Sequence, residues 1–169
     1  MIETQRLIIR PLSFDELTMH LKSPDKLAEE MGLIPSKSLI DSEAKDAIIH
    51  DLLPKLADSN KDSLFYTMWI IIGKSEKAII GGICFHGEPD ENGEVEIGYG
   101  IDEDYRNKGY MTETIDGLIH WLQNNKKARA VIAETDYSNR SSIRVLEKND
   151  FRLLRQTDHS VMMKRLIIQ

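Results

Sequence analysis

The sequence predicts an α+β fold in which a mixed central β-sheet is flanked by helices. The first third of the chain carries helix-start signals after one short apolar run. Residues 65–101 then change to runs of β-branched and aromatic residues separated by turns, a pattern typical of strands. Helical spacing returns afterwards, with apolar residues at i, i+3, i+4 and i+7: Ile115, Leu118, Ile119 and Leu122. The predicted element order is β-ααα-βββ-α-β-α-ββ.

The first third of the chain is expected to hold one strand and three helices, each bounded by a local signal. Arg10-Pro11 closes the strand, and Ser13 with Glu16 forms a capping-box pattern. A Ser-Pro step favours the start of the second helix, whereas Pro54 should kink or end the third helix early. The predicted elements are a strand at 7–9, a helix from 13 towards 22, a helix from 23 to Gly32, and a helix over 41–56.

The middle of the chain is predicted to form an antiparallel meander. Three strands are expected at 65–72, 78–85 and 95–101, with turns at 73–75 and 89–93 between them. After the amphipathic helix, the remaining predicted elements are a strand at 130–135, a helix over 141–149, and strands at 151–156 and 161–168.

Composition indicates one globular domain over residues 1–169. The hydrophobic fraction of 41% and the charged fraction of 30% argue against disordered, collagen-like and disulfide-rich classes. The net charge is −6, from 22 basic and 28 acidic residues, whereas a phosphate-backbone binding face needs a cationic surplus. We therefore expect no nucleic acid partner.

Other classes are disfavoured by local features. Charged residues interrupt the N-terminus, and the longest apolar run, residues 68–72, is too short for a membrane span, so we expect a cytoplasmic protein. Cys84 is the single cysteine and lies in an apolar run, which predicts a structural thiol. The five histidines show no ligand spacing, so no metal site is predicted.

The segment from Tyr99 to Thr112 carries the strongest chemical signal. It runs from a predicted strand through a charged loop directly into the amphipathic helix. A helix start exposes N–H groups and partial positive charge, Gly109 allows close approach, and Arg106 and Lys108 add full charges. These are the parts of a phosphate cradle. The alternative is an ordinary connection with solvated charges; the two common Gly-rich nucleotide motifs are absent from the sequence.

The strand before this loop contains two glycines, Gly98 and Gly100. Glycines in a strand weaken pairing and mark a bulge or a close approach by another chain. A strand opened in this way can offer its N–H and C=O groups to an amide-bearing ligand. Further on, Asn139-Arg140-Ser141-Ser142 opens the helix that precedes Phe151.

These segments together resemble the GNAT superfamily of N-acetyltransferases, particularly the branch that includes ribosomal-protein N-terminal acetyltransferases. The resemblance spans nearly the whole chain. The motifs that carry it, in order, are Thr4-Gln5-Arg6-Leu7 with Arg10-Pro11, Glu96-Ile97-Gly98-Tyr99, residues 106–113 and residues 139–151.

The resemblance implies acetyl-coenzyme A as cosubstrate and assigns residues to it. Tyr99, Gly100 and Ile101 would pair with the pantetheine arm, and the Tyr99 N–H would polarise the acetyl carbonyl. Asn139 would lie near the pantetheine or the reacting centre. The pyrophosphate would be bound by backbone N–H groups of the loop and helix start: Arg106, Asn107, Lys108, Gly109, Tyr110, Met111 and Thr112.

The chain departs from the family pattern at three positions. Met111 stands where the family usually has Gly or Ala, which predicts a more crowded helix start. Asp150 replaces a common glycine before Phe151, and we expect only a turn to change. Leu146 stands where many relatives carry a tyrosine general acid, so that role is not assigned here.

The implied mechanism is direct transfer of the acetyl group to a primary amine. Glu96 is the leading general base, with Glu94 on the same strand face as the second candidate; both also fit solvated strand positions. Ser142 or solvent would reprotonate the thiolate, with Tyr137 a weaker candidate.

The acceptor and the assembly stay open at this stage. The acceptor would be a protein N-terminus or a small amine such as a polyamine, an amino acid or an aminoglycoside, in a groove shaped by residues 13–56. A non-catalytic acetyl-coenzyme A-sensing module and a nucleotide-binding protein are the competing readings. Either a monomer or a homodimer fits the sequence.

Overall fold

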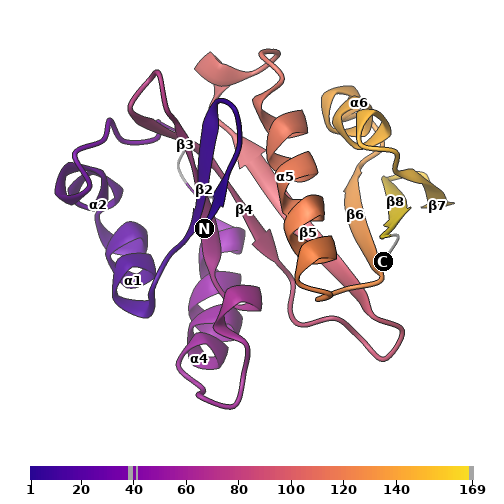
Figure 1. The fold of residues 1–169 in the computed structure, drawn as a ribbon, viewed down its shortest axis with the longest axis horizontal. Helices are drawn as coiled ribbons and strands as arrows, with labels where there is room; N and C mark the ends of the chain where they lie inside the picture. The colour runs from indigo at the N-terminus through magenta and orange to yellow at the C-terminus, as the bar shows by residue number, and fades with distance from the viewer. Residues whose placement is uncertain (38–39, 41, 168–169) are drawn as a thin grey trace.

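A computed structural model describes residues 1–37, 40 and 42–167 of the chain (Figure 1). Among these residues, eight strands form one sheet in the order β1-β2-β3-β4-β5-β6-β8-β7. Neighbouring strands are antiparallel except β5 and β6, which are parallel, so the sheet is mixed as predicted. The strands are β1 (Ile2–Glu3), β2 (Leu7–Pro11), β3 (Met68–Gly73), β4 (Ala78–Phe85), β5 (Glu94–Ile101), β6 (Ala130–Asp136), β7 (Arg152–Gln156) and β8 (Ser160–Leu166).

Helices flank both faces of the sheet. Trp69 and Ile70 are consecutive on β3 and therefore point to opposite faces. The Trp69 ring lies 5.1 Å from the Trp121 ring of α5, and Arg10, opposite Ile70 in register, bonds to Glu16 of α1. The helices are α1 (Phe14–Lys22), α2 (Pro24–Glu30), α3 (Ser42–Ala47), α4 (Leu53–Leu56), α5 (Tyr110–Asn124) and α6 (Arg140–Lys148). This arrangement confirms the predicted α+β class.

The N-terminal strand is longer than predicted and is half of a hairpin. It continues through Pro11, and β1 pairs with it through Ile2 and Ile9. A two-residue strand such as β1 is too short to produce a period in the sequence. The capping box before α1 is confirmed, because Ser13 Oγ accepts from the Glu16 N–H and Glu16 accepts from the Ser13 N–H.

The third predicted helix is interrupted just ahead of Pro54, which itself lies in the first turn of α4. A π-helical segment, Ile48–Leu52, lies between α3 and α4, and the Leu53 N–H bonds to the Ile48 carbonyl. Pro54 has no N–H to donate, so the regular α-helical hydrogen bonding cannot continue unchanged through it. The π-helical segment changes the bonding pattern just before the proline. The expected helix start at Asp41 lies outside the described residues.

The first strand of the meander starts later than predicted. Residues Ser63–Phe65 form a 3-10 turn, held by the bond from the Trp69 indole N–H to the Leu64 carbonyl. Strand β3 therefore begins at Met68. The later elements lie within one or two residues of their predicted bounds, although Ile168, the expected end of the last strand, lies outside the described residues.

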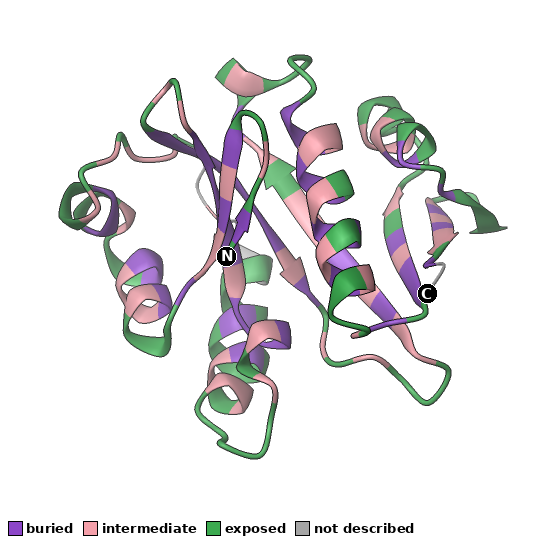
Figure 2. Cartoon of the chain, in the orientation of Figure 1, coloured by how far each residue is buried: buried purple, intermediate pink, exposed green. Residues whose placement is uncertain are grey.

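The core lies on both sides of the central strands, against the inner face of α5 and against buried residues of α1 and α2 (Figure 2). Its aromatic centre is a cluster of Phe65, Trp69 and Phe85 against Trp121. Strand β7, at the edge of the sheet, is exposed along its whole length. Among the helices of the described residues, none combines the length and the hydropathy that a membrane span requires.

Candidate active site

The sheet opens between β5 and β6. Their parallel pairing in the described structure covers Glu94 to Glu96, opposite Ala130 to Ile132. Strand β5 continues to pair with β4 as far as Ile101, while β6 turns away from it (Figure 1). The far half of β5 therefore has one edge that faces this opening.

The register of β5 decides which backbone groups face the opening. The His86 N–H donates to the Glu96 carbonyl at 2.9 Å, and the Asp102 N–H donates to the Ile80 carbonyl at 2.9 Å. The pairing with β4 runs in unbroken register between these two points. Backbone groups alternate along a strand, so even-numbered residues bond to β4 and odd-numbered residues, including Tyr99, turn to the opening.

The end of β5 supports this alternation. The Arg106 Nε approaches the Ile101 carbonyl at 3.5 Å, which places that carbonyl on the open side. Gly100 has open space where a Cβ would stand, and it keeps its pairing with Gly82 of β4. Gly100 thus marks an open approach and not a bulge, whereas the space beside Gly98 is occupied by the His86 ring. The register shift in this part of the sheet lies between β3 and β4.

The loop after β5 is anchored at its first residue. Asp102 is buried, and its carboxylate accepts from the Ser36 hydroxyl at 2.6 Å and from the Lys37 N–H at 2.8 Å. Lys37 also forms an ion pair with Asp104. The segment after α2 therefore holds the loop in place.

The loop ends in a helix start whose N–H groups point outward. Asn107 and Gly109 both have positive φ, at 60° and 80°, and Gly109 is the N-cap of α5. Helical bonding begins with the Glu113 N–H, which donates to the Gly109 carbonyl. The preceding N–H groups belong to Tyr110, Met111 and Thr112. Exposed Arg106 and Lys108 add positive charge next to them, which together favours a phosphate.

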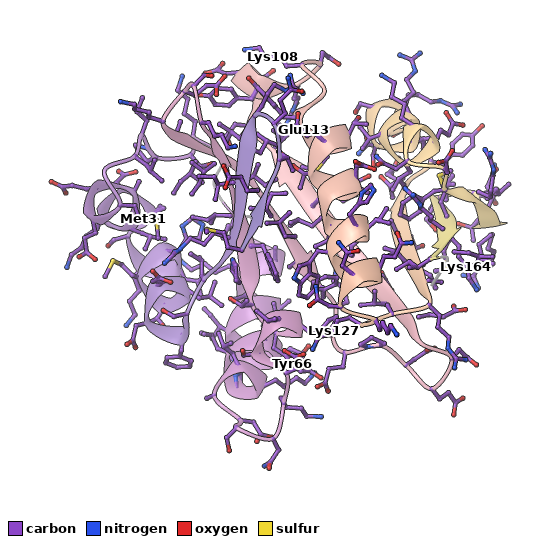
Figure 3. All side chains as sticks on the ribbon, viewed as in Figure 1. Met31, Tyr66, Lys108, Glu113, Lys127 and Lys164 are labelled. Carbon is purple, nitrogen blue, oxygen red and sulfur yellow. The ribbon has the colours of Figure 1, made fainter. Side chains whose placement is uncertain are left out.

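A set of contacts from the β1–β2 hairpin holds this helix start, and we call Thr4, Arg6 and Glu113 the loop clamp. The Glu113 carboxylate accepts from the Thr4 hydroxyl at 2.6 Å, the Arg6 N–H at 2.8 Å and the Arg6 guanidinium at 2.6 Å. Arg6 also donates to the Lys108 carbonyl at 2.9 Å. Figure 3 shows Lys108 and Glu113 together at this end of α5.

The clamp changes the acidity of Glu113. Partial burial by itself raises the pKa of this carboxyl, but the hydrogen bonds from Thr4 and Arg6 lower it below its usual value. The Glu113 carboxylate points to the hairpin and forms an ion pair with Arg6. Arg6 therefore neutralises the negative charge that would otherwise repel an anion at the helix start. The Thr4-Gln5-Arg6 motif, which had no predicted role, is thus a support for the loop.

Met111 does not crowd the helix start as the sequence suggested. Its side chain is buried in the core together with Tyr110, whose hydroxyl donates to Glu76. Only the backbone of these two residues is available to a ligand of the loop. Leu146, at the position of the family tyrosine, is fully buried on α6 and is part of the same core.

Tyr99 and Ser142 contact each other across the opening. The Tyr99 hydroxyl lies 2.8 Å from Ser142 Oγ, and burial raises the pKa of Tyr99, so it stays protonated near neutral pH. Asn139 caps α6, because its side-chain oxygen accepts from the Ser142 N–H at 3.1 Å and from the Ser141 hydroxyl at 2.9 Å. Asn139 therefore positions Ser142.

The two candidate bases differ in their partners. Glu94 is engaged by Lys164 in an ion pair. Glu96 bonds instead to the ring of His86, with 3.0 Å between Glu96 Oε1 and His86 Nδ1. His86 was not predicted as a site residue, although a hairpin turn centred on Glu91 places residues 86 and 96 opposite each other. In the described residues, no group of three or more His, Cys, Asp or Glu side chains is arranged to hold a metal ion.

The fold and the site define the class of protein. A central strand with one open edge leads directly into a helix start whose N–H groups and neighbouring cations suit an anion, an arrangement that fits a coenzyme-dependent acyl transfer enzyme. The family described as acetyltransferase (GNAT) domain matches residues 6–152, and the chain belongs to this family. It is an N-acetyltransferase.

Individual relatives agree with this assignment. The chain is 30% identical over 153 residues to the uncharacterized N-acetyltransferase YjdG of Bacillus subtilis, with 89% of each chain covered. Its fold is similar to that of ribosomal-protein-S5-alanine acetyltransferase from Vibrio fischeri, with a TM-score of 0.67, 16% identity, and 98% and 95% of the chains covered. It is also similar to RimL, a ribosomal L7/L12 α-N-protein acetyltransferase in complex with coenzyme A, with a TM-score of 0.66, 18% identity, and 97% and 96% covered.

Proposed function

We propose that residues 1–169 act as one domain that transfers the acetyl group of acetyl-coenzyme A to the α-amine of a protein N-terminus. The observation that carries this proposal is the continuous path from the open edge of β5 to the start of α5. The odd-numbered residues of β5 turn their backbone groups to the opening, and the anion-binding loop lies at the end of the same strand.

The residues present fit acetyl-coenzyme A along this path. The backbone groups of Tyr99 and Ile101 offer a strand edge to the amides of a pantetheine arm. Gly100 leaves open space beside them. The outward N–H groups at the start of α5, with Arg106 and Lys108 beside them, suit a pyrophosphate.

The chemistry follows from which groups face the opening. The thioester supplies an acetyl group with a good leaving group. The Tyr99 N–H would donate to the acetyl carbonyl oxygen and stabilise negative charge there. The Ser142 and Tyr99 hydroxyls, 2.8 Å apart, would return a proton to the thiolate, while the acceptor amine would lose its proton on the side of Glu96.

An α-amine is the acceptor that this site suits best. An α-amino group has a pKa of about 8, whereas a lysine side chain has one of about 10.4, so an α-amine needs less help to lose its proton. The part-exposed Glu96 and the exposed Glu134 lie on the same face of the sheet, where they would attract a cationic N-terminus. Two of the structurally similar proteins act on ribosomal proteins, one of them at the α-amine, which supports the same class here.

Thermal unfolding with acetyl-coenzyme A, coenzyme A and ATP tests the cofactor. A ligand at a hundred times its dissociation constant stabilises a fold by about 2.7 kcal/mol. We expect this shift with both coenzyme A forms, and a smaller one after Arg106→Glu with Lys108→Glu. The charge-matched control is Lys26→Glu with Lys148→Glu, two exposed lysines on α2 and at the end of α6, which should keep the full shift.

Thiol release with added amines tests the acceptor. Peptides with a free N-terminal alanine or serine should release coenzyme A faster than the same peptides blocked at the N-terminus. Faster release with spermidine or an aminoglycoside would move the acceptor to small amines. Cofactor binding without release in the presence of any amine would show a binding module and overturn the proposal.

A further inference from the structure

We propose that His86 is the catalytic residue that takes the proton from the acceptor amine, and that Glu96 is a positioning residue that orients its ring. This inference rests on the proposed function and assigns a new residue to the same site. It changes the role predicted for Glu96 from base to partner of the base.

The bond between the two side chains selects one form of the imidazole. An ionised carboxylate can only accept hydrogen bonds, so His86 Nδ1, 3.0 Å from Glu96 Oε1, must be the nitrogen that carries the proton. In the neutral ring the other nitrogen, Nε2, is then an acceptor. Both side chains are part-exposed, at 52% for His86 and 37% for Glu96, so an amine can reach this pair from solvent.

The ring lies beside the strand residue that precedes the Tyr99 N–H. A Cβ built on Gly98 would stand 2.9 Å from His86 Nε2, so the imidazole occupies the space that a side chain would fill. The Tyr99 nitrogen is bonded to the carbonyl carbon of Gly98, and its N–H faces the opening. The accepting nitrogen is therefore held close to the peptide unit that would polarise the acetyl carbonyl. Glycine at position 98 thus leaves the room that the His86 ring needs.

Imidazole suits this proton transfer better than a carboxylate. A general base is most effective when it titrates near the working pH, and histidine is the side chain that does so between pH 5 and 8. In the step, His86 Nε2 takes a proton as the amine nitrogen bonds to the acetyl carbon. The carbon–sulfur bond breaks and its electron pair leaves with the sulfur. The exposed imidazolium then releases its proton to water.

Other titratable groups share this face of the sheet and define the electrostatic setting. On β4 itself, Cys84 lies beside Gly98, and burial raises the pKa of its thiol. On β5, Glu94 is paired with Lys164 of β8. On β6, Glu134 is exposed on the same face, beyond the point where β5 and β6 separate. Of these groups, Glu96 is the one bonded to the imidazole.

The pH dependence of kcat/KM separates the two candidate bases. We expect His86→Ala to lower kcat/KM by about 10²–10⁴-fold and to remove the acidic limb of the profile. Glu96→Gln should lower it less and keep an acidic limb, and the double variant should resemble His86→Ala, because residues that act as a unit are not additive. Added imidazole should restore part of the His86→Ala activity. The control is His120→Ala on α5, which should leave the profile unchanged.

Two measurements give readouts besides turnover. Nitrogen NMR of the histidine rings should show the neutral His86 ring protonated at Nδ1 and unprotonated at Nε2, and Glu96→Gln should mix the two tautomers. The thermal shift with coenzyme A should be unchanged in His86→Ala, which shows that the fold and the cofactor site are intact.

Specific results would overturn the inference. An acidic limb that persists in His86→Ala and disappears in Glu96→Gln would make Glu96 the base. A wild-type ring protonated at Nε2 would contradict the geometry even without a turnover measurement. If the wild-type protein transfers acetyl groups normally and His86→Ala does so too, this inference fails while the proposed function stands. If the wild type binds no coenzyme A, the proposed function itself fails.

Discussion

Replacing Glu113 with glutamine tests the loop clamp and, through it, the placement of the loop that we propose binds the pyrophosphate. The wild-type carboxylate accepts three hydrogen bonds, from Thr4 and twice from Arg6, which lies more than a hundred residues away in sequence. Glutamine keeps the shape of the side chain and one acceptor oxygen. It removes the charge that Arg6 matches, and it places an NH2 group against one of the donors.

The size of the expected loss in unfolding free energy follows from how exposed the Arg6 and Glu113 side chains are. Hydrogen bonds to charged groups are worth about 1.5–3 kcal/mol, whereas exposed ion pairs are worth about 0.2–1 kcal/mol. The Arg6 side chain is 42% exposed and that of Glu113 is 18% exposed, which places the clamp between these limits. We expect a loss of about 1–2 kcal/mol in the free energy of unfolding. For a chain of this length, that lowers Tm by about 2–8 °C.

The pH dependence of the Tm difference between wild type and Glu113→Gln tests whether the carboxylate charge causes the stabilisation. Because the folded-state pKa of Glu113 is lowered, its stabilisation is complete above the unfolded-state pKa and is lost as pH falls through the folded-state pKa. The difference in Tm between wild type and Glu113→Gln should therefore be largest near pH 7. It should shrink below about pH 4.3, the ordinary glutamate value.

Scanning calorimetry from pH 7 to about pH 3, below the ordinary glutamate pKa, with titration by coenzyme A at pH 7, measures both consequences. Coenzyme A binding should weaken by up to about tenfold, equivalent to 1.4 kcal/mol, because the loop loses a support. Glu3→Gln is the control, since Glu3 lies on the same hairpin and its ion pair with Lys74 is exposed, and little change is expected. A Tm difference that stays constant across this pH range would refute the role of the charge.

Three further substitutions test other parts of the site. Gly98→Ala should displace the His86 ring and lower kcat/KM by about 10–100-fold with coenzyme A binding unchanged; unchanged kinetics would contradict the contact. Gly109→Ala, at φ 80°, should destabilise the fold by about 1 kcal/mol in urea denaturation, and a stabilised variant would contradict the left-handed cap. Leu146→Ala should cost about 2–5 kcal/mol, and a loss below 1 kcal/mol would contradict its full burial.

Local patterns in the sequence were sufficient for most of the backbone. The period of apolar residues located α5, and β-branched runs located β4 at its observed bounds. The capping box and Pro54 act within a few residues, so they marked the start of α1 and the break before α4. The order of motifs also led to the family, because each motif is a continuous stretch of chain.

Boundaries failed where neighbours in space overrule local preference. Phe65 is a good strand former, but it lies in a 3-10 turn because the Trp69 indole bonds to the carbonyl of Leu64. Strand β1 is only two residues long and exists through its pairing with β2. Met111, expected to crowd the loop, instead turns into the core.

The sequence by itself determined the class of fold, the order of its elements and the loop that suits a phosphate, since each depends on residues close together in the chain. Tertiary structure alone decided the opening between β5 and β6, the clamp from Arg6 to Glu113, and the pairing of His86 with Glu96. These depend on where strands separate and on which side chains meet after packing. A one-dimensional pattern does not carry that information, because the same local preference is compatible with many partners.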